Sequence, residues 1–308
     1  MRYALMLLLL APAACAPVRS ADAEPDFGAH WHDGRAELDG YTLRISRYGE
    51  PRDGEAVMVF VTEPFSRSQR VKLDDPSRTP GDAVEVLKLN FVRDFQTGIY
   101  DYNTMVSVFS RSDDFAPLKV SMSSAEWCGH VYEELVLHER TVDERVMSYF
   151  EGESHTRELE RRDGVLEDNL YIVLRGLRGA FLPAGGRTEV PFLPGPLISR
   201  LSHRPAEWTT AVIERPAAAE RVTVPAGRFD AIVYVVRTPE REGRFLIEAA
   251  YPHRILRWSW RASGNAGFLG GDESGELTGT ARLAYWQLNG SGDERYRAEL
   301  GLTGRTAP

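Results

Sequence analysis

Apolar and polar residues alternate along most of the chain after Trp31, which is the pattern of strands with one buried face. The clearest alternating runs in the first half lie at 41–45, 87–91, 106–108, 118–122 and 131–137. Residues 56–61 are instead apolar without a break, which is typical of a strand covered on both faces. Breaks that contain Pro and Gly separate the runs, so the pattern predicts a mostly β protein.

The same period of two returns in the second half. Predicted strands lie at 187–192, 197–201, 208–213, 221–224, 229–236, 245–249, 255–260 and 277–285. The turn at 225–227 separates two apolar runs with Pro and Gly, which predicts a hairpin. On the last strand Gly279, Ala281 and Leu283 share one face, and such small residues indicate the close approach of a backbone or a ligand.

One segment follows a helical period instead. The apolar residues that recur at spacings of three and four are Leu166, Leu170, Val173, Leu174 and Leu177. They fall on one face of a helix that Asp163 could cap and that Gly176 or Gly179 could end. The predicted fold is therefore a large curved antiparallel sheet, as a half-barrel or a sandwich, with one helix packed on it or in it.

No repeat of fixed period occurs, so we expect neither a propeller nor a solenoid. The expected organisation is a lipoprotein-type signal peptide over 1–15, a flexible tether over 16–30, a single β-rich domain over 31–288 and a polar tail over 289–308. Two halves, 31–160 and 161–288, would also fit the length of the domain.

The amino terminus has the features of an export signal. Residues 5–10 are apolar and follow a positive charge, but they fall far short of the about 20 residues that span a bilayer. The small residues before Cys15 resemble a bacterial lipoprotein cleavage site, which implies lipid on Cys15. Ala16 follows where Asp would favour the inner membrane, so the resemblance implies attachment to the outer membrane. Ordinary cleavage after residue 13 or 14, giving a soluble periplasmic protein, is the alternative.

Composition excludes one class of partner. The 308 residues carry a net charge of −8, and the chain has three lysines. Its arginines are scattered among acidic residues and form no basic stripe. Because neutralised phosphates supply most of the affinity for nucleic acid, we expect no nucleic-acid partner.

Histidines provide one candidate site. His30 and His32 flank Trp31 and would lie on the same side of a strand, where both could bind one metal ion. Asp33 and His130 are conceivable further ligands. The alternative is a pair of surface histidines, and we expect no bound metal and no other cofactor.

A second candidate centres on the remaining thiol. Residues 126–130 bring together the carboxylate of Glu126, the thiol of Cys128 and the imidazole of His130. A nucleophilic thiol needs a nearby base, but such groups usually come from different elements of a fold. With lipid on the leader cysteine, Cys128 has no partner for an internal disulfide. We expect it to be buried, with Trp127 and Tyr132 packed beside it.

Aromatic residues offer a third clue. They include Tyr100, Tyr102, Phe109, Trp127, Tyr149, Trp258, Trp260, Tyr285 and Trp286. In an open sheet such rings could hold an acyl chain or a glycan, but filling the core is the more common role. The sequence contains no G-x-S-x-G, H-E-x-x-H, Walker or strand-associated G-x-G-x-x-G motif.

Three motifs carry a resemblance to a known family. They are the D-x-L-x-x-x-L-R-x-L pattern over 168–177, the P-x-G-x-F-D turn over 225–230 and the segment 251–256. This half of the chain resembles a bacterial family of exported proteins of unknown function. The resemblance implies a curved antiparallel sheet with a helix in its concavity, similar to the half-barrels that shuttle lipoproteins. It implies no activity, because the family has none assigned.

The first half is similar to proteins catalogued as septum formation inhibitors, through residues 47–50 and 61–65. The α/β nucleotide pyrophosphatases that bear this name begin with an S-x-S-P-R-R loop. This sequence has no such loop.

Three functional hypotheses follow. The first is an exported envelope lipoprotein without enzymatic activity that binds a lipid, a glycan or another envelope protein. The second is a metal- or thiol-dependent hydrolase that uses His30, His32, Cys128 or His130. The third is a structural scaffold of the envelope. An apolar cavity beside residues 166–177 would favour the first.

Cell fractionation tests the export prediction. The cleaved protein should be found in the envelope fraction, because the leader directs it out of the cytosol. Intact, uncleaved protein in the cytoplasmic fraction would overturn the prediction.

Overall fold

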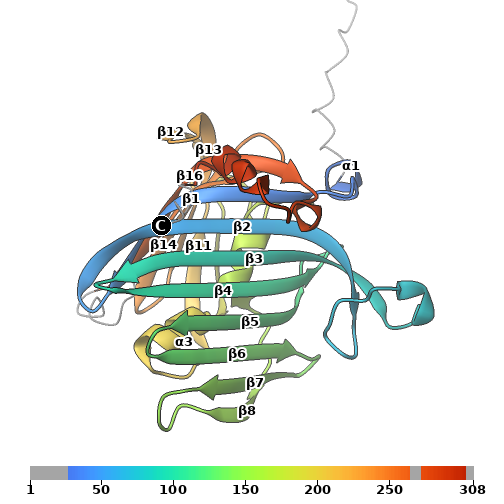
Figure 1. The fold of residues 1–308 in the computed structure, drawn as a ribbon, viewed down its shortest axis with the longest axis vertical. Helices are drawn as coiled ribbons and strands as arrows, with labels where there is room; N and C mark the ends of the chain where they lie inside the picture. Colours follow the sequence, from blue (N-terminus) through green and yellow to red (C-terminus); the bar gives the residue numbers. More distant parts are fainter. Residues whose placement is uncertain (1–26, 264–271, 303–308) are drawn as a thin grey trace, which may run out of the picture.

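The computed structural model describes residues 27–263 and 272–302, and one large sheet dominates it (Figure 1). The strands are β1 (Ala36–Arg47), β2 (Glu50–Ser66), β3 (Ala83–Thr97), β4 (Tyr100–Arg111), β5 (Pro117–Glu126), β6 (Gly129–Leu137), β7 (Thr141–Ser148), β8 (His155–Glu160), β9 (Val165–Leu166), β10 (Arg187–Leu193), β11 (Thr209–Glu214), β12 (Glu220–Val224), β13 (Gly227–Arg237), β14 (Arg241–Glu248), β15 (Ile255–Ala262) and β16 (Glu273–Leu283). The prediction of a mostly β protein built on a large curved sheet is confirmed. The predicted leader, with Cys15, lies outside the described residues.

The sheet follows the chain closely. Strands β1 to β8 form an antiparallel meander, and β16 pairs with β1 on the other side. From β16 the sheet continues through β15, β14, β13, β11 and β10 to β9, and β12 pairs with β13 in the predicted hairpin. The sheet curls so that β11, β13 and β14 lie behind β2 to β4 in Figure 1, and it stays unclosed between β8 and β9.

Helices are short. They are α1 (Phe27–Trp31), α2 (Leu170–Val173) and α3 (Pro196–Ser202), with 3-10 turns η1 (Pro76–Arg78), η2 (Glu167–Asn169), η4 (Tyr285–Gln287) and η5 (Asp293–Leu300). In the described part of the chain no helix has the length and apolar character to cross a bilayer.

The helix predicted around 166–177 is shorter than its apolar pattern suggested. Leu166 pairs with Leu193 in the sheet, so the chain is still extended there and Asp163 caps nothing. The helical turns begin at Glu167, and the chain leaves them before Gly176, which has a φ of +64°.

Residues 165–202, which we call the inserted segment, join the sheet through β9 and β10 and cover its concave face with η2, α2 and α3. Tyr171 of α2 stands between its two sides. The Tyr171 ring centroid lies 5.0 Å from that of Phe91 on β3 and 5.4 Å from that of Phe245 on β14, both edge to face. Trp258 of β15 lies 6.1 Å away on the same side as Phe245. These contacts make the core continuous across the curve.

Buried ion pairs join the inserted segment to strands at three places. The pairs are Arg175–Glu37, Arg200–Glu126 and Arg241–Glu167. All six side chains are at most 8% exposed. Since each pair has one member in the inserted segment and one on a strand, they fix where the segment lies.

The prediction of a strand over 197–201 is wrong, because these residues belong to α3. Pro196 occupies the first helical position and Gly195 before it is extended, which is a favourable helix start. Leu197 and Leu201 are four apart and both buried, so they also fit a helical period.

The folded domain extends beyond both predicted boundaries. At the start, Phe27 and Trp31 of α1 are buried, so the tether cannot reach residue 30. At the end, η5 covers the convex face, where Leu300 and Leu302 are buried against β1, β2 and β16. The described part of 289–308 is therefore not a loose tail.

The small residues on β16 accommodate this covering segment. A Cβ atom placed on Gly279 would lie 2.2 Å from the carbonyl oxygen of Glu299, and one on Gly40 would lie 2.1 Å from that of Leu300. The predicted close approach at Gly279 is thus to a backbone. The second face of the apolar run at 56–61 is covered in the same way, since Val59 and Val61 belong to this convex cluster.

Gly279→Ala tests this packing. The added methyl group should displace η5 from the sheet, because the opposing atoms are backbone and cannot rotate away. Limited proteolysis should then release a C-terminal peptide faster than in the wild type. Gly81→Ala is the matched control, since a Cβ atom placed on Gly81 would have nothing within 4 Å. Equal cleavage of the two variants would contradict the assignment.

Candidate functional site

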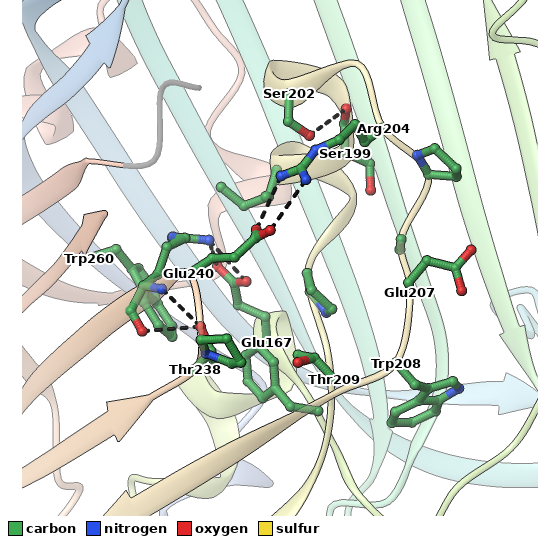
Figure 2. A pocket seen from close by; sticks show the side chains of 17 residues that line it. Glu167, Ser199, Ser202, Arg204, Glu207, Trp208, Thr209, Thr238, Glu240 and Trp260 are labelled. Atoms are coloured by element: carbon green, nitrogen blue, oxygen red, sulfur yellow. Dashed lines mark hydrogen bonds and ion pairs between the residues drawn. The ribbon is translucent and has the colours of Figure 1, made fainter. Parts of the chain in front are cut away.

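A cleft of about 500 Å³ opens where α3 and the following loop face the β13–β14 turn. We call it the α3 cleft. Its walls include Phe192, Ile198, Trp208, Thr238, Arg241 and Trp260. Five separate parts of the chain therefore build it: η2, β10, the α3 region, the β13–β14 hairpin and β15 (Figure 2).

A buried ion pair forms the floor of the cleft. Arg241 Nη1 donates to both carboxylate oxygens of Glu167, at 2.9 and 3.1 Å. Glu167 also accepts a hydrogen bond from Gly195 N at 3.3 Å. The Arg241 guanidinium lies 4.4 Å from the ring centroid of Trp260, a cation–π arrangement. Arg241 and Glu167 are thus held rigidly without any ligand.

Several buried donors around the cleft have no partner among the residues that the structure describes. They are Ser199 Oγ, Trp208 Nε1, Arg241 Nε and Trp260 Nε1. Burying a donor without an acceptor costs about 1–3 kcal/mol. All four groups can donate, but each atom is buried, so a ligand that carries hydrogen-bond acceptors reaches them only when the lining side chains move.

A second ion pair spans the mouth. Arg204 donates to both carboxylate oxygens of Glu240, at 3.2 and 3.1 Å, and Figure 2 shows the two side chains facing each other. Both are about half exposed, so this pair contributes little to stability. It joins the loop after α3 to the β13–β14 turn and can open at low cost.

A buried carboxyl group lies directly behind the floor. Burial raises the pKa of Asp168 to about 7, and the neighbouring negative charge of Glu167 acts in the same direction. Arg93 and Arg241 oppose the shift. Asp168 is therefore partly protonated near neutral pH, although most aspartates are fully ionised there.

A smaller cavity of about 170 Å³ lies on the other side of α3, against β6 and β7. Glu133 lines it, and burial raises the pKa of Glu133 to about 9, with the charges of Glu144 and Asp168 adding to the effect. His155 lies at its edge and is hydrogen-bonded to Glu144 at 3.2 Å. A protonated Glu133 can serve as a donor to the cavity.

The predicted histidine site does not form among the described residues. His30 and His32 lie on α1 and its end instead of a strand, and they contact different carboxylates, Glu37 at 3.3 Å and Glu85 at 3.1 Å. His130 is exposed on β6, at the edge of the sheet opposite to Glu85. The conceivable ligand Asp33 pairs with Arg282 at 2.6 Å. No group of three potential metal ligands occurs in residues 27–263 and 272–302.

The prediction that Cys128 is buried is wrong. Cys128 is exposed, because Trp127 and Cys128 form the turn between β5 and β6. Trp127 is 69% exposed, so it does not pack over the thiol. Glu126 faces inward and pairs with Arg200, and His130 points to solvent. The three groups of this motif therefore do not converge.

The residues of the α3 cleft were not apparent in the sequence, apart from Trp260 among the aromatics. Glu167 and Arg241 are 74 residues apart, and only the curve of the sheet brings them together. One signal was available. Glu167, Asp168 and Asn169 are consecutive polar residues within an apolar segment, and all three are buried. Such residues need partners, and so they mark a polar interior.

Asp168→Asn tests the raised pKa. Between about pH 4 and pH 7 the folded protein retains a proton that the unfolded chain releases. Wild-type stability should therefore fall as pH rises through this window, by up to about 1.4 kcal/mol per pH unit from this group, and level off above it. The variant should lose this pH dependence. Its free energy of unfolding, measured with urea, should therefore rise relative to that of the wild type as the pH approaches 7.5. Asp74→Asn, at a side chain 99% exposed, is the control. Parallel pH profiles for wild type and Asp168→Asn would refute the assignment.

Comparisons with known proteins give few relatives. No protein-family model and no curated protein matches the chain. A β-barrel-like protein of the domain of unknown function DUF1849 from Brucella abortus is similar at 11% identity and a TM-score of 0.46, over 80% of this chain and 98% of that one. A domain from Vibrio parahaemolyticus named for a proposed role in outer membrane lipoprotein sorting is similar at 8% identity and a TM-score of 0.23, over 90% of this chain and 95% of that one. At these values neither structure assigns a function to this chain.

Proposed function

We propose that this protein is a non-enzymatic binding protein of the cell envelope that holds a small amphiphile in the α3 cleft. The observation that carries the proposal is the composition of the cleft. Its walls are largely apolar, and unpartnered hydrogen-bond donors lie among them. An acyl chain with an anionic or acceptor-rich head group matches both features.

The size and rigidity of the cleft support binding. About 500 Å³ lies within the range of small-molecule sites. The walls include Phe192, Ile198, Pro205 and Pro239, which are side chains that suit a hydrocarbon. The floor pair is in place without a ligand, and the mouth pair can open at low cost, so binding requires little reordering of the protein.

The chemistry of the lining argues against catalysis. Its three carboxylates, Glu167, Glu207 and Glu240, each pair with an arginine, and none is free to act as a base. The described residues that line the cleft include no histidine and no cysteine. The hydrolase hypothesis depended on His30, His32, Cys128 and His130, and none of these lines the cleft.

The envelope location belongs to the proposal as well. The leader supports export, and Cys15 would carry the lipid that attaches the protein to the outer membrane. A glycan is the main competing ligand, because the half-buried indole of Trp208 could stack on a sugar ring, whereas Trp260 is 1% exposed beside Arg241. The apolar walls between these indoles favour the acyl chain.

Binding of dansylaminoundecanoic acid, a fluorescent fatty acid, tests the proposal. Its emission should rise in the presence of the protein, and palmitate should displace it. Trp208→Ala removes part of the wall and should weaken binding about tenfold, which corresponds to about 1.4 kcal/mol of lost apolar contact.

Trp286→Ala is the matched control, since Trp286 is 46% exposed on η4 and lies outside the cleft. It should leave the affinity unchanged. Displacement of the probe by maltohexaose but not by palmitate would show that the ligand is a glycan instead of a lipid. Equal affinities of the two variants for the probe would show that the α3 cleft is not the binding site.

A further inference from the structure

Four hairpin turns of the meander lie along one end of the half-barrel. In an antiparallel meander alternate turns fall at the same edge of the sheet. The turns β1–β2, β3–β4, β5–β6 and β7–β8 therefore share one edge, on the left of Figure 1, and α1 lies at the opposite end.

These four turns expose large apolar side chains. Tyr48 is 57% exposed, Ile99 81%, Trp127 69% and Tyr149 70%. We call these residues, together with Tyr100, the aromatic rim. At the opposite edge the tight β6–β7 turn carries Glu139 and Arg140 instead. Monomeric proteins rarely expose a contiguous apolar surface without a use for it.

The rim is contiguous and held in place. The Tyr48 hydroxyl is hydrogen-bonded to Tyr102 at 2.8 Å and accepts from Tyr100 at 3.2 Å. The Tyr100 ring centroid lies 6.4 Å from that of Trp127. The Tyr149 ring lies over Gly129, where a Cβ atom would be 2.5 Å from it. Tyr48, Tyr100 and Trp127 thus form a connected row over the first three turns, and Tyr149 packs on β6 at the fourth, so little entropy is lost when these rings meet a partner.

The charges around the rim largely cancel. Glu50 pairs with Arg52 at 2.7 Å, Asp53 with Arg44 at 3.8 Å and Glu153 with His203 at 2.6 Å. Two further carboxylates, Asp101 and Glu151, are exposed on the same turns. The rim therefore has a small excess of negative charge and no excess of cations, so it favours a surface without net charge over an anionic one.

The mouth of the α3 cleft lies at this same end. In the sheet, the end of β1 pairs with Glu273 at the start of β16, and Glu273 pairs with Trp260 near the end of β15. Ala262, the last residue of β15, pairs with Arg241, the first residue of β14. The β13–β14 turn with Glu240 is therefore at the edge that carries Tyr48. His203, which precedes Arg204 of the mouth pair, contacts Glu153 in the β7–β8 turn.

We propose that the aromatic rim seats this end of the protein on a zwitterionic phospholipid bilayer. Tyr and Trp rings favour the level of the lipid head groups, because they combine an apolar body with a polar tip. Ile99, the most exposed apolar side chain of the rim, enters furthest. Four tips along one edge can touch a plane together, and the seated protein presents the mouth of the cleft to the lipid. The role of the mouth rests on the proposed amphiphile binding, but the seating does not.

The exposed thiol makes a local test available. Residues 16–308, which follow the lipid-bearing Cys15, contain Cys128 as their only cysteine. A nitrobenzoxadiazole label on Cys128 should brighten and shift to the blue when phosphatidylcholine vesicles are added. The same label on Cys128→Ser/Ser77→Cys, in η1 near the opposite edge, should not change.

Sedimentation with the vesicles measures the affinity. Trp127→Ala/Tyr149→Ala should lower the partition coefficient at least tenfold, and Trp286→Ala should not. Trp208→Ala should leave vesicle binding intact, so failure of the cleft and failure of the rim are separable. Replacing a third of the lipid with phosphatidylglycerol should not strengthen binding.

Three results would overturn the proposal. They are no binding to phosphatidylcholine vesicles, equal responses of the two labels, and a dimer that forms through the rim and is lost in Trp127→Ala/Tyr149→Ala. The last result, from sedimentation velocity, would assign the rim to a second copy of the chain instead.

Discussion

The architecture depends on how the three buried arginine–carboxylate pairs attach the inserted segment to the sheet. An open curved sheet leaves its concave face uncovered, and here the chain covers it with residues 165–202. Apolar contacts alone would tolerate a shift of this segment, because hydrophobic burial has no direction. Removing one member of a buried pair leaves a charge without a partner, at a cost of about 3–5 kcal/mol. The pairs therefore contribute to placement more than to net stability, and Arg241–Glu167 in this way becomes the floor of the cleft.

The same polar interior explains the shifted carboxyl groups. Asp168 and Glu133 are buried near other carboxylates, and the surrounding arginines are already paired. Their protons are retained because a second negative charge there would have neither water nor a free cation near it. Such groups destabilise the fold at neutral pH relative to apolar residues of the same size. Their presence beside two cavities fits a protein that retains polar chemistry inside for contact with a ligand.

The sequence pattern was informative where a single periodicity held. Most predicted runs overlap an observed strand, but β1 to β4 extend up to six residues beyond them, and β7 and β8 had no predicted counterpart. The pattern failed at 197–201, where Leu197, Ser199 and Leu201 satisfy a period of two and the leucines also satisfy a helical spacing. It also failed at Cys128, since a turn made of Trp127 and Cys128 lacks the residues that usually mark turns. The α3 cleft could not be predicted, because the curvature of the sheet decides which distant strands face one another.

This distribution of residues has a further consequence. Arginine–carboxylate pairs lie inside the half-barrel, and large apolar rings lie at its rim. In an antiparallel meander, an aromatic residue in any odd-numbered turn adds to the same row, whereas one in an even-numbered turn lies at the opposite edge. The row at Tyr48, Ile99, Trp127 and Tyr149 is therefore built from four independent positions on one edge. A binding cleft with its mouth at that edge needs a route for an amphiphile that avoids water, and contact between the rim and a bilayer would supply it.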